Sequence, residues 1–506
     1  MMTMTPLLLL AVALKFVFEA VQCLKCVFLH PLSTIPGPWY ASLSDWWLAY
    51  HTFRFEQANV VHNLFAKFGP IVRAGPNKIL FRDAQAMRDV YIIRRFEKGP
   101  VYQSFKLNGM DHAFTILDNE SHAARRRASG PHYSAANIAH FQSQMHKETL
   151  SLVDKLESIA GQMSVDCLDL LKTYHAQLAV LSIFGYHLGA VEKWSTDTPN
   201  EFCQAISDFP KQGIVKRFFP RWVWALLCCI PNKRWKSFTQ CSKLLTEFAM
   251  ARTLELEQQL ELGKEFEASP PLVYRLLQYH QPLSHNPLEH DVVITDCLAH
   301  LIAGVETTAN TLVYFLWQLA CSPQIQRKLQ LEIDSAMLDR SIIPKLSILQ
   351  NLPYLNAFIN EGCIFRPPRP RCDFRSIGTC CPAGSELHLA WTRPSPPALL
   401  SALKRGLCTA TPTCFPPPET FDPERWLDNS EPAGVARATH MMPFGIGTRV
   451  CSGQALAQAA LLIPLVAIVR NFRIRAGEST TDESMRKKHG SVRSVSYDFC
   501  DVMLIK

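Results

Sequence analysis

The stretch Met442-Pro443-Phe444-Gly445-Ile446-Gly447-Thr448-Arg449-Val450-Cys451-Ser452-Gly453 decides the fold of this 506-residue chain. It is a glycine-rich loop that presents Cys451 at the start of a helix, because residues 454–462 are mostly strong helix formers. A helix N-terminus carries partial positive charge and unpaired N–H groups, which favour ionisation of that thiol. The two loop glycines let the backbone turn tightly and approach a flat cofactor closely. Arg449 is placed to bind an anionic group of that cofactor with a forked hydrogen bond.

The pattern Phe444-Gly445-x-Gly447-x-Arg449-x-Cys451-x-Gly453 resembles the cysteine loop of the cytochrome P450 family of haem-thiolate monooxygenases. The resemblance implies a haem b cofactor (iron protoporphyrin IX) with Cys451 as the proximal ligand of its iron. It also implies that Phe444 packs beside the cysteine, that Arg449 binds a haem propionate, and that Gly445 and Gly453 belong to the haem-binding set. The alternative is a buried cysteine that follows a chance glycine loop.

Composition excludes some classes of protein. The net charge of +8 is spread along the chain without a long basic run, which argues against a nucleic-acid binder. That charge suits an anionic membrane surface or an acidic protein partner, and a solvated surface explains it equally well. The 17 cysteines have no regular spacing, so most are expected to be reduced thiols facing the cytosol rather than a secreted disulfide framework.

Residues 1–29 are expected to form an N-terminal membrane anchor. Residues 6–14 are almost wholly apolar, but polar residues interrupt the apolar stretch beyond them, and a spanning helix needs roughly 20 mainly apolar residues. A signal peptide is the alternative, although a basic leading segment is missing. Residues 30–38 form a stiff, proline-rich hinge that resembles the linker after the anchor in microsomal members of the family. The resemblance implies an endoplasmic reticulum membrane protein whose catalytic domain faces the cytosol.

Residues 39–506 are expected to form a single, mainly helical catalytic domain with a small β region, the cytochrome P450 fold. Residues 67–81 predict two short strands separated by a Gly-Pro-Asn turn. In the family, the region that corresponds to residues 202–217 forms part of the roof of the substrate pocket. Helical patterns with polar faces recur over four segments: 148–156, 176–183, 236–262 and 271–281.

Residues 119–127 predict a basic helical segment. On a helix, His122 and Arg126 are four residues apart and share a face. The family usually places Trp and Arg at this spacing, where they hold a haem propionate. The resemblance therefore gives this role to Arg126, with His122 as a usable donor in place of the Trp. An exposed basic turn is the alternative.

Residues 291–321 form the longest apolar stretch and stop at a Ser-Pro pair. At ~1.5 Å per residue, this helix would be about 45 Å long, enough to cross a large domain. A transmembrane span is the alternative, but a polar seam indicates a buried core helix. The seam consists of Asp296, His300, Glu306 and Asn310.

Within this helix lies the motif Ala303-Gly304-Val305-Glu306-Thr307-Thr308. The small residues Ala303 and Gly304 leave room for a cofactor or a diatomic ligand against the backbone, and the following acid and hydroxyl can relay protons. The motif resembles the family's oxygen-activation motif. The resemblance implies that Thr307 steadies dioxygen and that Glu306 is part of the proton path. A threonine-rich helix kink is the alternative.

The family pattern breaks in the helix that carries its Glu-x-x-Arg motif, which corresponds to residues 353–362. The glutamate is Glu361, but Ile364 stands where the arginine is expected. Arg425 is the family's second arginine, which normally completes a buried ionic cluster with that pair. Removing one member of such a cluster costs roughly 3 to 5 kcal/mol. Arg366 is the nearest substitute, but the proline after it favours the end of the helix, so we do not expect a rescue.

The chain departs from the family pattern a second time, over residues 385–414. Between Gly384 and Phe415, which both fit the family pattern, lie 30 residues, more than the pattern implies. Residues 393–397 and 408–412 have neither strand alternation nor helix periodicity. We expect part of the region between Asp373 and Cys414 to be a misread exon boundary or a local frameshift. A true surface insertion is the alternative.

The resemblance implies insertion of one oxygen atom from O2 into a small apolar organic substrate, in secondary metabolism or detoxification. Electrons would come from a separate NADPH-dependent cytochrome reductase in the membrane, because the chain has no nucleotide-binding glycine fingerprint. A monomer is expected. Three alternatives stay open: a reductase-independent haem isomerase, a catalytically impaired or inactive paralogue that lacks the Glu-x-x-Arg arginine, and a non-enzymatic helical membrane protein.

Overall fold

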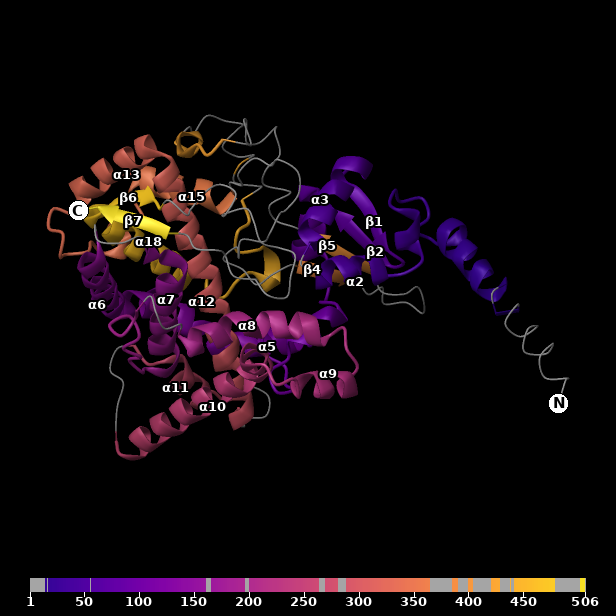
Figure 1. Cartoon of the computed structure of the whole chain (residues 1–506), viewed down its shortest axis with the longest axis horizontal. Helices are drawn as coiled ribbons and strands as arrows, with labels where there is room; N and C mark the ends of the chain where they lie inside the picture. Colours follow the sequence, from indigo (N-terminus) through magenta and orange to yellow (C-terminus); the bar gives the residue numbers. More distant parts are fainter. Residues whose placement is uncertain are drawn as a thin grey trace. The chain divides into compact units, whose positions relative to one another are not determined.

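Figure 1 shows the structure, a computed structural model. The chain divides into two compact units. The smaller unit consists of residues Met1–Gly99 and Gly384–Lys404, and the larger unit consists of residues Pro100–Ala383 and Arg405–Lys506. The expectation of one catalytic domain over 39–506 stays a prediction, as does the anchor, since residues 1–13 lie outside the described part. The structure describes residues 14–15, 17–54, 56–160, 165–195, 200–263, 269–280, 288–364, 385–389, 399–403, 420–427, 437, 441–477 and 501–505.

The smaller unit is built on a four-stranded sheet of order β1-β2-β5-β4. β1 (Ile71–Gly75) and β2 (Lys78–Phe81) pair antiparallel, which confirms the two strands predicted within 67–81. β5 (Leu399–Leu403) pairs parallel with β2, and β4 (Ser385–Leu389) pairs antiparallel with β5. Part of the segment expected to be an insertion or a misread stretch therefore forms strands. Residues 393–397 and 408–412 lie outside the described residues.

Short helices and the proline-rich hinge surround this sheet. The hinge lies against β1, because the Arg73 N–H donates to the carbonyl of Pro36 at 2.8 Å. The buried guanidinium of Arg73 also donates to the carbonyl of Cys26 at 3.1 Å, which ties the chain before the hinge to the same strand. The helices of this unit are η1 (Lys25–Leu29), η2 (Trp39–Ser42), α2 (Trp46–Phe53), α3 (Gln57–Phe68), α4 (Ala84–Arg88) and η3 (Asp89–Ile93).

The larger unit is mainly helical and has one small sheet, of order β3-β7-β6, as the sequence predicts for the fold class. Its first half contains η4 (Pro100–Phe105), α5 (Asn119–Ser129), η5 (Gly130–Tyr133), α6 (Ala135–Ile159), β3 (Val165–Asp166), α7 (Cys167–Phe184), α8 (Glu201–Lys216), α9 (Arg221–Cys228), α10 (Lys233–Glu261) and α11 (Leu272–Leu277). Its second half contains α12 (His290–Cys321), α13 (Pro323–Ala336), α14 (Leu346–Leu349), α15 (Pro353–Ile364), η6 (Pro423–Trp426), η7 (Gly447–Arg449), α18 (Gln454–Asn471), β6 (Arg473–Ala476) and β7 (Asp501–Ile505).

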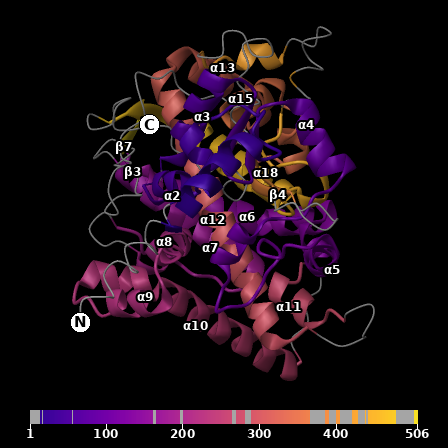
Figure 2. The same ribbon diagram turned by 90° about the vertical axis from the view of Figure 1, so that its right-hand side faces the viewer.

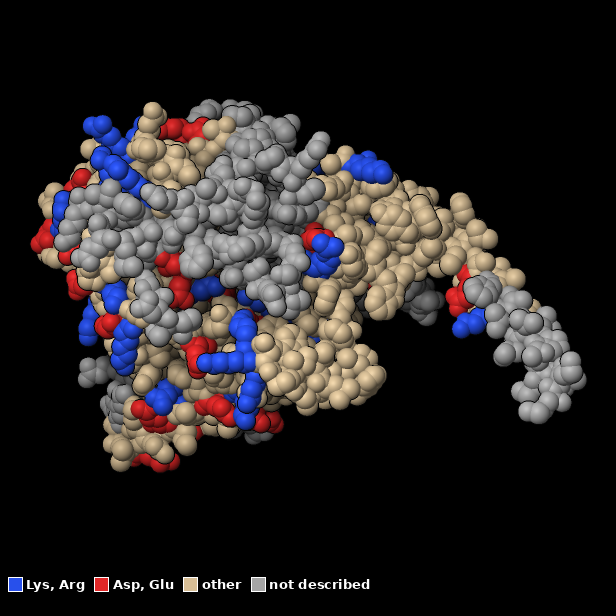
Figure 3. All heavy atoms as spheres, in the orientation of Figure 1, with Lys and Arg blue, Asp and Glu red and all other residues tan. Residues whose placement is uncertain are grey.

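The helix α12 forms the centre of the larger unit, and its bounds confirm the helix predicted over 291–321. α7 and α18 pack against α12, and α6 packs against both (Figures 1 and 2). Among the described residues, α12 and α18 are long and apolar enough to cross a membrane, but 56% and 67% of their most apolar windows are buried inside the protein. They are therefore core helices. On the face of this unit drawn in Figure 3, basic and acidic side chains are interspersed.

Candidate active site

The cysteine loop, residues 442–453, has the backbone that its glycines predict. Gly445 has φ +80° and Gly447 has φ +73°, a left-handed conformation that glycine adopts without strain. The Cys451 N–H donates to the carbonyl of Phe444 at 2.9 Å and so closes the loop. Phe444 is buried in the hydrophobic core of the unit, and the half-buried Cys451 packs against the same core. The structure thus presents Cys451 shortly before the first residue of α18, as the sequence predicts.

Two arginines join this loop to α5. The Arg449 guanidinium donates to the carbonyls of the turn 116–118, at 3.0, 2.7 and 2.9 Å, just before the helix begins. From α5, Arg126 donates to the carbonyl of Thr448 at 3.3 Å and to that of Val450. The loop therefore binds the backbone that leads into α5, and α5 binds the backbone of the loop.

The predicted propionate binders meet where α5 contacts the cysteine loop. His122 lies one turn before Arg126 on α5 and is buried, and Asp118 caps the helix by accepting the Ser121 N–H at 2.7 Å. Arg449 approaches the same end of α5 from the loop. Arg126 and Arg449 thus both bridge α5 and the cysteine loop, and His122 lies on α5 one turn before Arg126; contact of these side chains with a propionate stays a prediction.

The predicted oxygen-activation motif forms an open face on a helix that is otherwise mostly buried. Ala303 and Gly304 are exposed and Thr307 is half-buried, whereas Leu301 and Val305 on the other side of the helix are buried. A Cβ atom placed on Gly304 would meet no atom within 4 Å. The Thr307 hydroxyl donates to the carbonyl of Ala303 at 2.7 Å. These small residues leave the space that the sequence predicts.

Tyr133 connects the open face of α12 with the start of α18. Its hydroxyl shares a hydrogen bond of 2.8 Å with Nδ1 of His300, one turn before Ala303. A Cβ atom on Gly453 would lie 3.7 Å from Cε1 of the Tyr133 ring. Burial lowers the pKa of His300 to about 4 and raises the pKa of Tyr133, so both groups are neutral at pH 7. No local sequence signal marked Tyr133.

Glu306 lies on a different side of α12 from Thr307 and contacts α7 and α8. Its carboxylate forms an ion pair with Lys172 at 2.9 Å and accepts hydrogen bonds from Ser207 and, at 3.1 Å, from Asn310. Burial alone would raise the pKa of Glu306, but Lys172 and Ser207 outweigh it and lower that pKa to about 2. Among the described contacts, none joins Glu306 to Thr307. Sequence reasoning did not identify Lys172 or Ser207 as partners.

The polar seam predicted on α12 is confirmed, and it separates into two stripes. Asp296 and His300 share a stripe with Thr307, because the spacings of four and seven residues return to one helix face. Asp296 forms an ion pair with Arg125 of α5 at 3.2 Å. Burial raises the pKa of Asp296 to about 6, although Arg125 opposes this shift. The second stripe carries Glu306 and Asn310.

Glu361 and Arg425 form the buried ion pair that the sequence predicts, with Arg425 Nε 3.2 Å from Glu361 Oε2. The same oxygen accepts the Trp426 indole N–H at 2.9 Å, and Oε1 accepts the Asp422 N–H at 3.0 Å. The glutamate of the incomplete Glu-x-x-Arg motif thus has three donors. Ile364 is the last residue of α15. Its side chain and Arg366 lie outside the described part of the chain.

Comparison with known proteins agrees with this site. The family described as Cytochrome P450 matches residues 41–372 and 406–500, and so leaves out 373–405, within the region that we expected to be misread or inserted. The chain is 26% identical to the cytochrome P450 monooxygenase stcB of Emericella nidulans over 483 residues, which cover 94% of this chain and 89% of that protein.

Two further relatives are cytochrome P450 monooxygenases, TRI4 of Trichoderma arundinaceum and ABA2 of Pyricularia oryzae. Each is 26% identical to this chain. The match to TRI4 covers 93% of this chain and 90% of that protein, and the match to ABA2 covers 92% of this chain and 89% of that protein. The family match spans most of the chain, including the cysteine loop, both arginines that hold it, and the open face of α12. The chain therefore belongs to the cytochrome P450 family and is a cytochrome P450 monooxygenase.

Proposed function

We propose that this monooxygenase uses haem b to insert one oxygen atom of O2 into a small apolar organic molecule, in secondary metabolism or detoxification. The observation that carries the proposal is the cysteine loop, in which left-handed glycines and the hydrogen bond from Cys451 N–H to Phe444 O present one thiol at the start of α18. The fungal relatives that are themselves monooxygenases support the reaction class.

The residues present fit a haem. A half-buried thiol near a helix N-terminus suits an iron ligand, the accessible helix surface at Gly304 suits close approach of a flat ring, and three basic side chains suit its two carboxylates. Cys451 would bind the iron, while His122, Arg126 and Arg449 would bind the propionates. Phe444, Gly445 and Gly453 would shape the cysteine side of the pocket. When bound, a thiolate-ligated haem supplies the activation of O2.

The residues of α12 would then orient dioxygen and handle protons. Ala303 and Gly304 keep the helix backbone accessible, and the Thr307 hydroxyl is free to rotate from the Ala303 carbonyl toward the pocket. Glu306 is ionised at neutral pH because of its contact with Lys172, so in this path its carboxylate accepts a proton before passing it on. The substrate would lie beneath α8, which Ser207 ties to Glu306.

We assign the electron supply to an NADPH-dependent cytochrome reductase and the location to the endoplasmic reticulum membrane, with residues 1–29 as anchor and the catalytic part, a monomer, in the cytosol. The proline-rich hinge 30–38 and the membership of the cytochrome P450 family support this assignment. A catalytically impaired paralogue is the second candidate, and Ile364 is the observation that favours it. The three donors around Glu361 favour an intact haem pocket.

A carbon monoxide difference spectrum of the reduced, purified protein tests the proposal. We expect the long-wavelength Soret band that gives the family its name. Cys451→Ser should abolish that band and turnover, whereas Cys229→Ser, at an exposed cysteine, should leave both unchanged. A blue-shifted band or no band in the wild type would favour the impaired paralogue. A Cys451→Ser variant with the wild-type band and turnover would refute the assignment of the iron ligand.

A further inference from the structure

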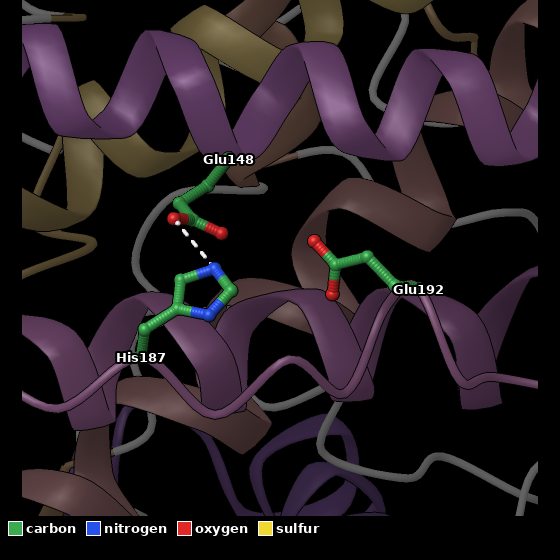
Figure 4. A group of neighbouring side chains, drawn as sticks. All are labelled: Glu148, His187 and Glu192. Atoms are coloured by element: carbon green, nitrogen blue, oxygen red, sulfur yellow. Dashed lines mark ion pairs between the residues drawn. The ribbon is translucent and has the colours of Figure 1, made fainter.

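A second group of possible metal ligands lies in the larger unit, outside the candidate active site. Glu148 comes from α6, and His187 and Glu192 come from the connection that follows α7. One ligand atom from each residue lies within 4.8 Å of the other two, and the three side chains point toward one another (Figure 4). The family motifs and the proposed reaction use none of these residues.

Two of the three ligand atoms have a separation that suits a shared metal ion. Glu148 Oε1 lies 3.2 Å from His187 Nε2. Two ligands at about 2.0 to 2.1 Å from a tetrahedral zinc ion are about 3.3 Å apart. Glu192 is exposed, and a rotation of its side chain can bring one carboxylate oxygen to the same ion. The side chain of His187 is 48% exposed, which leaves an entry path from solvent.

Outer contacts orient both carboxylates, and Gln177 hydrogen-bonds to each of them. The Gln177 amide donates to Glu148 Oε2, and its oxygen accepts the N–H groups of Ala190 and Val191 at 2.6 and 3.1 Å. Ser151 donates to Glu192 Oε1 at 2.7 Å. Such outer-shell hydrogen bonds orient the ligands of metal sites. Gln177 therefore fixes both the buried ligand and the connection that carries the other two.

Charge also favours a cation at this place. Glu148 is 3% exposed, and among the described residues its one ion pair is the contact with His187. Two carboxylates and a neutral imidazole carry a charge of about −2, which a divalent ion balances. An imidazole in the donor set favours zinc over magnesium or calcium, which take oxygen ligands.

We propose that Glu148, His187 and Glu192 bind one Zn²⁺ ion, with water as the fourth ligand. The ion would clamp the connection after α7 onto α6. Because α6 and α7 both pack in the core around α12, the expected role is structural. The site is independent of the haem, and its loss should leave the carbon monoxide difference spectrum unchanged.

Zinc titration of the chelator-treated holoenzyme tests the site. Wild type should bind one Zn²⁺ per chain more than His187→Ala or Glu192→Gln, and zinc should raise the thermal midpoint of the wild type but not of these two variants. His290→Ala is the matched control, because His290 Nε2 lies 2.8 Å from Glu257 Oε1 with no third ligand among the residues that the structure describes. This control should bind zinc like the wild type. Glu192→Gln changes an exposed side chain, so a folding defect does not obscure the result.

X-ray absorption at the zinc edge separates this site from zinc held by cysteines. Protein loaded with one equivalent should show a shell of nitrogen and oxygen at about 2.0 to 2.1 Å and no sulfur shell near 2.3 Å. Equal zinc stoichiometry in the wild type, both site variants and the control would overturn the proposal. A sulfur shell that persists in Glu192→Gln would overturn it too, since the ion would then be bound by thiolates.

Discussion

Replacing Arg425 by methionine tests whether Arg425 stabilises the fold in the absence of the arginine that Ile364 replaces. Glu361 is 2% exposed, and of its three donors the Asp422 N–H and the Trp426 indole are neutral. Burial raises the pKa of Glu361 and the three donors oppose this shift, and Arg425, at 3.2 Å, is the donor that carries the opposite charge. Arg425→Met leaves that charge uncompensated and should lower the free energy of unfolding by about 3 to 5 kcal/mol. Trp426→Phe removes one hydrogen bond to a charged group and should cost about 1.5 to 3 kcal/mol.

Denaturant unfolding of the haem-loaded protein, followed by circular dichroism, measures these costs. Lys328→Met is the matched control, because Lys328 and Glu424 form an ion pair in which both side chains are at least half exposed. That change should cost at most about 1 kcal/mol. Glu361→Gln combined with Arg425→Met should cost less free energy than the sum of the two single changes, because the double variant contains no uncompensated carboxylate. If Arg425→Met costs no more than Lys328→Met, the reasoning about the buried pair is wrong.

Three other substitutions and one sequencing experiment probe separate parts of the chain. Ile364→Arg restores the expected cation and should raise the ratio of haem to purified protein. An unchanged ratio would mean that the three donors around Glu361 are sufficient for haem binding. Burial raises the pKa of Asp296 to about 6 from 3.8, so the folded state holds a proton that the unfolded chain loses. Wild type should therefore gain stability over Asp296→Asn as the pH falls from about 6 to 4, by at most about 1.4 kcal/mol per pH unit, in urea titrations at each pH. Lys172→Met should raise the pKa of Glu306 and move the acid limb of the pH–rate profile upward; an unmoved limb excludes Glu306 from the proton path. Sequencing the spliced transcript across 373–405 should reveal a different reading, and an identical one would establish a true insertion.

The elements that the sequence predicted well are those with local causes. The helix α12 has a continuous apolar run and a Ser-Pro stop, and its observed start differs from the prediction by one residue. The cysteine loop depends on backbone conformations that Gly445 and Gly447 adopt, and these can be read from residue type and spacing. Motif residues such as Arg126 could be placed on the correct helix face from periodicity alone.

Contacts between distant segments could not be predicted in this way. Tyr133 and His300 are 167 residues apart, and neither lies in a motif that names its partner. The two strands β4 and β5 are five residues each, and β5 pairs with β2 across more than 300 residues. Periodicity assigns a residue to a face of its own element, but which element meets that face depends on packing of the whole unit. For the same reason Lys172 was not foreseen as the partner of Glu306.

The polar residues of α12 determine how the helix is rotated about its own axis. Burial of apolar area alone does not fix how a helix is rotated about its axis, because the hydrophobic effect has no direction. Here Asp296 pairs with α5, His300 with η5 and Glu306 with α7. A shift of one residue turns a helix by about 100° and would break all three contacts together, which would deprive three half-buried partners of these contacts. Since Thr307 shares a face with Asp296 and His300, the rotation that satisfies these pairs is also the one that leaves Thr307, with the exposed Ala303 and Gly304, on the open face of α12.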